Sequence, residues 1–321
     1  MFFLLLAQAK ESACKTLYQY TEDLGDAFAK HAASTLALVL PNLGPRNAVS
    51  VQVVSAAIVP RLVAMASRAA ASASPDSSAA AIGEAQARRV SWACFLVAQA
   101  MLDASVDALC EVVSRISSDL GAALEAGSGE DMEPTCLAAD SLSSLMGDHC
   151  KVKDPSPLRL SGEREMTAVT VLRDAAAASM RRSDLRTSAM GASAAAKSQH
   201  HPLKGLTGAV DAADEEEQEE WEADLLTSAV DGIGWVIKGR REAFVPAFES
   251  TLKPLVLPLL AIDPQLQQQQ QQQIVPSPSQ ASFALCMCID VLEHCGESGR
   301  QSVFPSLLPA LLSGCNPDQV S

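Results

Sequence analysis

Two distant stretches of this chain carry the same pattern of two helices joined by a turn, and this repetition limits the possible folds more than any other feature. When Ala27-Phe28 is aligned with Ala243-Phe244, Ser34-Thr35-Leu36 falls on Ser250-Thr251-Leu252. In each copy the second helix opens with the phenylalanine. A pair of helices cannot bury its apolar face alone, so we expect such pairs to stack on one another.

Glycine is expected to end the first helix of each pair, because it adopts the left-handed cap conformation without a steric penalty. The pattern assigns this role to Gly25, Gly147, Gly239 and Gly296, the last in a looser copy that ends near Leu312. Repeated antiparallel helix pairs of about 40 residues are typical of HEAT-type arrays. The predicted fold is therefore all-α, an α-solenoid of HEAT-type antiparallel helix pairs with a long flexible linker and an acidic loop.

Composition supports helices, since the chain is 48% hydrophobic but only 4% aromatic, whereas strands favour aromatic and β-branched residues. No stretch is expected to be long and apolar enough to span a membrane. Apolar residues at helical spacing predict helices over residues 17–24, 27–40, 49–70, 92–101, 106–124, 135–146, 163–182, 224–238, 243–260, 282–294 and 303–312.

The chain is expected to have three parts. Residues 1–182 form helical repeats, 183–223 form a flexible linker with an acidic run, and 224–321 form further helical repeats. The linker is predicted because Ser, Ala, Gly, Lys and His replace the periodic pattern up to Pro202. A polyglutamine stretch predicts a loop insertion at 263–280. The last repeat is incomplete, so we expect the chain to be a section of a longer array.

The acidic run is the main candidate for binding. Nine of the 38 acidic residues lie between Asp211 and Asp224, with no Lys or Arg among them, and they account for much of the net charge of −14. Such a run attracts basic protein segments over a long range, whereas nucleic acid needs a basic face. An indole can also stack on the stem of a basic side chain. The candidate cargo-binding residues are Asp214, Glu215, Glu216, Glu217, Glu219, Glu220, Trp221, Glu222 and Asp224.

Two other interpretations of the acidic run remain open. The run is a solvated loop whose last acids favour the N-terminus of a helix beginning near Asp224. Alternatively, arginines of the preceding helix fold back onto the acids; the available ones are Arg173, Arg181, Arg182 and Arg186.

The stretch ALCMCIDVLEHCGESG at 284–299 raises the question of a metal or thiol site. On a helix, Cys286 and Cys288 are about 200° apart and point to different faces. Cys288 and Cys295 instead fall on one apolar stripe with Leu285 and Leu292. Because a zinc site needs four converging ligands, we expect buried, reduced cysteines and no metal or cofactor.

Catalysis has little support in the sequence. The five histidines have no motif around them, His200-His201 lies in the predicted linker, and no phosphate-binding G-x-x-x-x-G-K-[ST] loop occurs. Gly232-Ile233-Gly234 lies within a helical pattern and predicts close helix packing. We therefore expect a binding protein and not an enzyme.

The segment Asp290–Cys295 resembles a helix of the importin-β family of nuclear transport receptors, in particular its importin β-3 (importin 5) type. Val245–Glu249 with Leu252 and Pro254, and the acidic run leading into Asp224, are similar to the same family. The resemblance implies a middle-to-late section of a longer receptor. It also implies import of basic cargo such as histones or ribosomal proteins, contact with nuclear pore proteins, regulation by the GTPase Ran, and shuttling between cytoplasm and nucleus.

An alternative from another class is a HEAT-repeat scaffold subunit, for example in a phosphatase or a chromosome-organising assembly. An acidic segment that binds basic cargo distinguishes the two, because a scaffold does not need one. A thiol- or metal-dependent enzyme is the third possibility.

Overall fold

The chain forms helices joined by short turns, and no strand occurs in the part of it that the structure describes. The computed structural model describes residues 2–72, 84–126, 133–150, 158–197, 208–260 and 276–314. The all-α prediction is confirmed for these residues. The first half contains α1 (Phe2–Leu24), η1 (Gly25–His31), α2 (Ala32–Val39), η2 (Leu40–Leu43), α3 (Val49–Ser72), α4 (Glu84–Ala126) and α5 (Glu133–His149).

The second half begins with two long helices, α6 (Gly162–Lys197) and α7 (Gly208–Arg240). Short helical segments follow, and two further helices complete the described chain. These elements are η4 (Arg241–Phe244), α8 (Val245–Ala247), η5 (Phe248–Leu252), α9 (Lys253–Leu260), α11 (Pro278–His294) and α12 (Gly296–Gly314).

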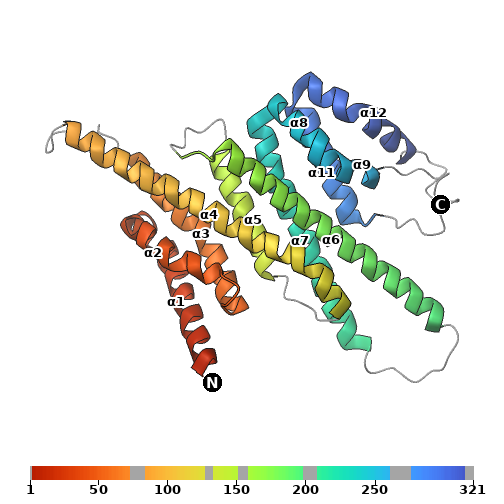
Figure 1. The fold of residues 1–321 in the computed structure, drawn as a ribbon, viewed down its shortest axis with the longest axis horizontal. Helices are drawn as coiled ribbons and strands as arrows, with labels where there is room; N and C mark the ends of the chain where they lie inside the picture. Colours follow the sequence, from red (N-terminus) through yellow and green to blue (C-terminus); the bar gives the residue numbers. More distant parts are fainter. Residues whose placement is uncertain are drawn as a thin grey trace.

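The helices follow one another across the molecule in chain order (Figure 1). A first row contains α1, α3, α5, α7 and α11, and each of these packs on the next one. In a second row, α2, α4 and α6 pack in that order, and α9 packs on α12. The core therefore lies between two rows of helices, and each part of it is built from neighbouring helices.

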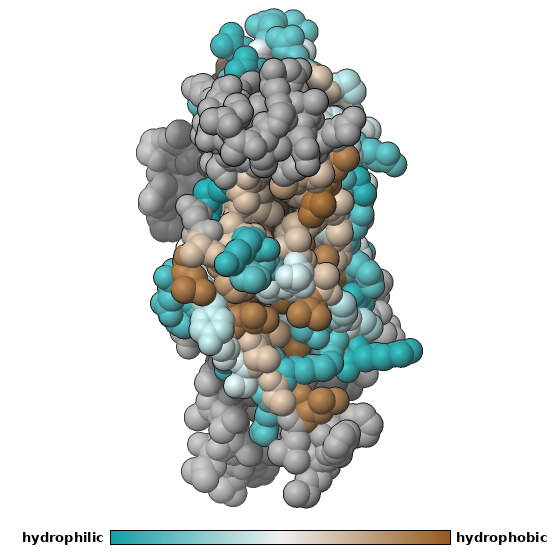
Figure 2. Space-filling view, turned by 90° about the vertical axis from the view of Figure 1, so that its left-hand side faces the viewer, coloured by the Kyte–Doolittle hydropathy of each residue, from teal (hydrophilic) through white to brown (hydrophobic). Residues whose placement is uncertain are grey.

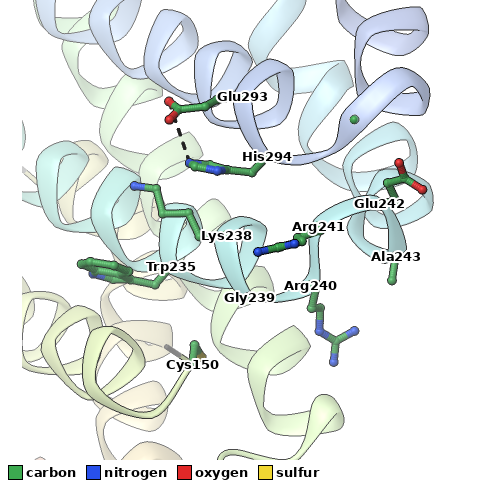
Figure 3. Close-up of a pocket in the computed structure, with 11 residues that line it drawn as sticks. Cys150, Trp235, Lys238, Gly239, Arg240, Arg241, Glu242, Ala243, Glu293 and His294 are labelled. Carbon is green, nitrogen blue, oxygen red and sulfur yellow. Dashed lines mark ion pairs between the residues drawn. The ribbon is translucent and has the colours of Figure 1, made fainter. Parts of the chain in front are cut away.

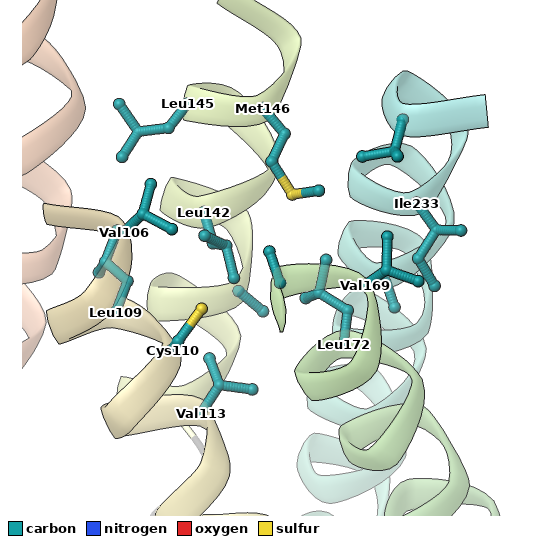
Figure 4. Close-up of a cluster of buried hydrophobic side chains, with 14 of the residues drawn as sticks. Val106, Leu109, Cys110, Val113, Leu142, Leu145, Met146, Val169, Leu172 and Ile233 are labelled. Carbon is teal, nitrogen blue, oxygen red and sulfur yellow. The ribbon is translucent and has the colours of Figure 1, made fainter. Parts of the chain in front are cut away.

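The middle of this core is drawn in Figure 4. Leu142 and Met146 of α5 lie between α4, which supplies Leu109, and the pair α6 and α7, which supply Leu172 and Ile233. All five side chains are buried. Few of the core residues are aromatic, so the helices approach closely through Ala, Val, Leu and Met, as the composition indicated.

Two predicted boundaries are wrong. The predicted helices 92–101 and 106–124 are one helix, α4, because nothing between them breaks the backbone pattern. The predicted linker is helical at both ends, since α6 runs on to Lys197 and α7 begins at Gly208. Alanine and glutamate favour helices even where no apolar stripe marks them. The segment 198–207 lies outside the described residues, and the division of the chain into two groups of helical repeats remains a prediction.

The predicted polyglutamine loop ends earlier than expected. Residues 278–280 form the first turn of α11, and residues 261–275 lie outside the described chain. Ser277 caps this helix: its hydroxyl accepts a hydrogen bond from the backbone N–H of Gln280, and the Gln280 side chain accepts one from the backbone N–H of Ser277. Such a reciprocal capping box is a strong helix start, and proline at the first helical position adds to it.

The corners of the repeated helix pairs show why the glycine prediction is only half right. Gly25 and Gly296 have positive φ angles of 47° and 60°, as expected for a left-handed cap. At the corner after α7 this conformation belongs to Arg241, with φ of 53°, and not to Gly239. Arg241 is the residue that aligns with Gly25 in the repeat. Gly147 lies inside α5, where an added Cβ would be 2.8 Å from Nε1 of Trp235, so its role is close packing.

After each corner, buried residues recur at every fourth position. Phe244, Phe248, Leu252 and Val256 are all fully buried, although four residues advance about 40° beyond a full α-helical turn. Residues Phe248–Leu252 form a π-helical turn, which is wider and offsets this drift. The π-turn therefore keeps one stripe directed at the core.

Three stretches of the described chain are long and apolar enough to cross a membrane by length and composition: Val49–Ala71, Trp92–Arg115 and Glu219–Leu260. Our expectation that no stretch is long and apolar enough to span a membrane is wrong, because frequent alanine and valine raise the average hydropathy of packed helices. In this structure 44% of the first window and 39% of the second are buried among other helices. The absence of membrane insertion remains a prediction.

Apolar side chains are also exposed at both ends of the array. Leu38 of α2 is 71% exposed, and Figure 2 shows apolar side chains gathered on the side of the molecule where α1 and α2 lie. At the other end, Phe304, Leu308 and Leu312 form an exposed stripe along α12. These exposed faces are apolar in composition, like the helix faces that neighbouring helices cover in the middle of the molecule.

The two phenylalanines Phe248 and Phe304 provide a matched test of the packing. Phe248 is fully buried and Phe304 is 51% exposed. We expect Phe248→Ala to lower the free energy of unfolding by about 3–5 kcal/mol, because it leaves a cavity in the core. Phe304→Ala should change it by less than about 0.5 kcal/mol. Chemical denaturation of both variants measures the difference, and equal effects would contradict the position of the core.

Candidate functional site

The acidic run lies on the N-terminal half of helix α7 and not in a loop. The prediction of an acidic loop is wrong because Glu, Gln and Ala are good helix formers. In addition, acids near a helix N-terminus interact favourably with the helix dipole. Asp214, Glu215, Glu216 and Glu217 all lie within this helix. A helix places successive acids around its axis, so only some of them share a face.

The structure separates the remaining candidate residues into two groups. Glu219, Glu220 and Asp224 are exposed to solvent. Trp221 is partly buried and packs against the hydrophobic core, and Glu222 is only 6% exposed. The outward acids are therefore available to a partner, whereas Trp221 and Glu222 serve the packing of α7.

A buried ion pair explains why Glu222 faces inward. Nε of Arg182 on α6 lies 3.0 Å from Oε1 of Glu222, and the two side chains are only 6% and 7% exposed. An arginine of the preceding helix thus folds back onto the acidic run, as one of the two alternative interpretations predicts. Two other named arginines have different partners. Arg173 forms an ion pair with its neighbour Asp174, and Arg181 donates a hydrogen bond to the carbonyl oxygen of Ala177. The side chain of Arg186 lies outside the described structure.

The backbone of Trp221 is held from a third helix. The thiol of Cys136 on α5 donates a hydrogen bond to the carbonyl oxygen of Trp221, with Sγ 3.0 Å from the oxygen. Burial raises the pKa of this thiol to about 12, and the nearby Asp224 adds to the effect. Cys136 is therefore a neutral donor at physiological pH, and α5, α6 and α7 together fix the end of the acidic run.

Beside this segment is a groove of about 540 Å³ between α6, α7 and the start of α11. Its wall contains Glu219 and Glu220, and the groove is otherwise rich in serine. The lining residues are Ser179, Met180, Ser183, Glu219, Glu220, Glu222, Ala223, Leu226, Ser277, Pro278, Ser279 and Gln280.

The groove has polar groups that suit a cationic side chain. The hydroxyl of Ser179 is 1% exposed and has no hydrogen-bond partner among the residues that the structure describes. Gln280, in contrast, is satisfied, because its amide donates to the carbonyl oxygen of Met180 and to Asp184. An ammonium or guanidinium group entering past Glu219 and Glu220 finds carboxylates at the rim and a hydroxyl acceptor inside.

A second, larger pocket of about 930 Å³ lies where α5, α7 and α11 end (Figure 3). Its lining carries charges of both signs, including Lys238, Arg241 and Glu293. The complete lining is Cys150, Trp235, Lys238, Gly239, Arg240, Arg241, Glu242, Ala243, Glu293, His294 and Gly296. No sequence motif pointed to this pocket, because its residues come from three separate helices and from the corner after α7.

The stretch 284–299 answers the question of a thiol or metal site. Cys288 and Cys295 are fully buried in the core, as predicted, and burial raises the pKa of each thiol to about 11. Cys295 donates a hydrogen bond to the carbonyl oxygen of Arg241, which joins the corners after α7 and α11. Within the described ranges no group of three His, Cys, Asp or Glu residues is placed to hold a metal ion.

The two glycines of α7 have the packing role predicted for them. A Cβ at Gly232 would lie 2.6 Å from Cδ1 of Leu172, and a Cβ at Gly234 would lie 2.5 Å from Oδ2 of Asp290. Lys238 is 3.4 Å from Asp290 on the same side. The Asp290–Cys295 segment thus contributes helix contacts through Asp290 and Cys295.

Comparison with known proteins does not assign this chain to a family. No protein-family model matches it, and no protein of curated function matches its sequence. Its function is therefore inferred from the arrangement of its own residues.

The buried ion pair gives a first test of this site. Replacing only one partner leaves a buried charge, and we expect Glu222→Gln to lower the free energy of unfolding by about 3–5 kcal/mol. The double change Arg182→Met with Glu222→Leu removes both charges and should recover most of that loss. Denaturation with urea measures all three proteins. A double variant that is at least as destabilised as Glu222→Gln would contradict a coupled pair.

Thiol reactivity gives a second test. Cys94 is exposed, whereas Cys136 and Cys288 are buried with raised pKa values. A thiol reagent at neutral pH should label Cys94 rapidly and these two only after denaturation, because the thiolate is the reactive species. Mass spectrometry of the labelled peptides identifies each site. Rapid labelling of Cys136 in the native chain would contradict the packing of α5 on α7.

Proposed function

We propose that this chain is a section of a nuclear transport receptor of the importin-β type, built from HEAT-type helix pairs, that binds basic protein segments for import into the nucleus. The observation that carries the proposal is the acidic face of α7, where Glu219 and Glu220 border a groove. The resemblance of Asp290–Cys295 to that family supports the same assignment.

The stacking of the helices supports a HEAT-type array. α1, α3, α5, α7 and α11 pack in sequence as one row, and the other helices lie along them. The corners at Gly25, Arg241 and Gly296 share the left-handed conformation, as expected for equivalent positions of repeated pairs. In such an array each pair contacts mainly its neighbours, so a long surface is offered to a partner.

The charge distribution supports a basic partner. The chain has a net charge of −14, and the outward residues Glu219, Glu220 and Asp224 continue the acidic run of α7. Acidic surfaces attract basic segments over a distance and raise the rate of association. The Ser179 hydroxyl inside the groove adds a short-range acceptor for a lysine or arginine side chain.

The family resemblance extends the proposal to other partners. It implies regulation by the GTPase Ran, contact with nuclear pore proteins, and movement between cytoplasm and nucleus. Cargo of this type includes nuclear-localisation segments, histones and ribosomal proteins. Binding of this kind is non-covalent and requires no cofactor or catalytic residue.

A second candidate function is that of a HEAT-repeat scaffold subunit in another complex. It is favoured by the internal use of Trp221 and Glu222, which shows that part of the acidic run stabilises the array itself. A scaffold of this kind holds its partners through packed surfaces and does not depend on exposed acids.

Binding of a fluorescein-labelled lysine- and arginine-rich nuclear-localisation peptide tests the transport proposal. We expect salt-sensitive binding that weakens on going from low salt to about 0.15 M ionic strength. Glu219→Gln with Glu220→Gln should weaken binding at low salt by about tenfold, because it removes both rim carboxylates. Fluorescence anisotropy measures the affinity.

A matched control removes two acids elsewhere. Glu111 and Glu297 are each 70% exposed, so Glu111→Gln with Glu297→Gln removes the same two negative charges without touching the groove. The Glu111→Gln and Glu297→Gln double variant should bind the peptide nearly as well as the unchanged chain does. If both double variants lose affinity equally, the attraction is general and the groove is not the site. If no form binds the peptide, the scaffold function is the better one.

A further inference from the structure

Arg241 occupies a backbone conformation that disfavours every residue except glycine. Its φ is 53°, and among the described residues that are not glycine it alone has a positive φ. The equivalent corners use Gly25 and Gly296. A left-handed conformation is unfavourable for an L-residue, and residues held in it cluster at functional sites. The chain thus keeps an arginine where glycine is easier to accommodate.

Stabilisation of helix α7 does not account for this arginine. Cations near a helix C-terminus interact favourably with its dipole, but Lys238 and Arg240 already occupy the last turn. The backbone carbonyl of Arg241 accepts the hydrogen bond from Cys295, and glycine at this position would supply the same carbonyl. What distinguishes arginine here is its side chain.

The neighbouring cations are already paired, and Arg241 is not. Nζ of Lys238 lies 3.4 Å from Oδ1 of Asp290. Nε of Arg240 lies 2.6 Å from Oε2 of Glu165, and Arg240 also donates a hydrogen bond to the backbone carbonyl oxygen of Gly162, the first residue of α6. The Arg241 guanidinium has no ion pair or hydrogen bond to any residue that the structure describes.

The side chain of Arg241 points into the pocket of Figure 3. Its guanidinium extends toward the space between Lys238 and His294, with the indole of Trp235 on the far side of Lys238. Lys238 lies over that indole, with Nζ 5.1 Å from the ring centroid. Arg241 is exposed to solvent, so its guanidinium is an accessible, planar double donor on the wall of this pocket.

The acidic side chains in and around the pocket are directed at other groups and not at the Arg241 guanidinium. Glu242 points away from the guanidinium, and its carboxylate lies against Gly296, where any Cβ would collide with it. Glu293 is directed at His294, with 3.9 Å between the nearest oxygen and nitrogen, and its side chain is 68% exposed and well solvated. Asp290 is paired with Lys238.

We propose that this pocket docks a peptide segment that carries a carboxylate, and that Arg241 binds this carboxylate through the two parallel hydrogen bonds of a guanidinium–carboxylate pair. The volume of about 930 Å³ leaves room for several residues of a peptide beside the carboxylate, whereas a small ion fills far less. This site is separate from the acidic groove and does not depend on the function proposed above.

The test uses the full chain and arrays of random 12-residue peptides, one set with amidated and one with free C-termini. The variant Arg241→Gly removes the guanidinium and also relieves the strained backbone. We expect it to lose binding by about tenfold or more toward peptides with Asp or Glu, because charge-assisted hydrogen bonds are strong. Its melting temperature should be equal to or higher than that of the unchanged chain.

Three controls make the outcome decisive. Arg46→Gly removes the same charge from an exposed turn between η2 and α3 and should bind as the unchanged chain does. Replacing Glu by Gln in each selected peptide should abolish its binding, and the two array sets distinguish a side-chain carboxylate from a terminal one. Unaltered peptide binding by Arg241→Gly overturns the proposal. Failure of the unchanged chain to bind any peptide of either set also overturns it. If inorganic phosphate then binds at Arg241 by calorimetry, the pocket is a simple anion site.

Discussion

The structure depends on how closely α7 approaches its neighbours. This helix lies against α5, α6 and α11 at once, and two of its positions have no side chain where the other helices are nearest. Gly232 faces Leu172 and Ser143, and Gly234 faces Asp290. A methyl group at either position forces the side chain of Leu172 or of Asp290 to move from its present place. The contacts of α7 with α6 and α11 are therefore shaped by these two glycines.

Much of the fold could be predicted from the sequence because its signals are local. Helical spacing, the aligned phenylalanines at 28 and 244, and the cap at Gly296 are all patterns within a short segment. The long helix α4 and the helical acidic run were missed because alanine and glutamate form helices without leaving an apolar stripe. The left-handed corner at Arg241 was missed because the nearby Gly239 was the better candidate by residue type, although the repeat aligns Arg241 with Gly25.

The candidate site was predictable to a lesser degree. A run of acids is visible in any sequence, but its division into outward Glu219 and Glu220 and inward Glu222 depends on which face of α7 meets α6. That face is set by tertiary contacts of α5 and α6. The pocket around Arg241 was even harder to predict from sequence patterns, because its residues come together only where the ends of three helices meet. Charge patterns thus indicated a region, and packing selected the residues.

The buried pair of Arg182 and Glu222 has a mechanical consequence. Arrays of helix pairs bend when neighbouring helices slide or tilt on one another. A slide of one turn between α6 and α7 carries Glu222 about 5.4 Å from its partner and leaves a lone charge in apolar surroundings. The joint between these two helices therefore resists sliding more strongly than joints whose ion pairs are exposed to water, such as Arg61–Glu22 between α3 and α1.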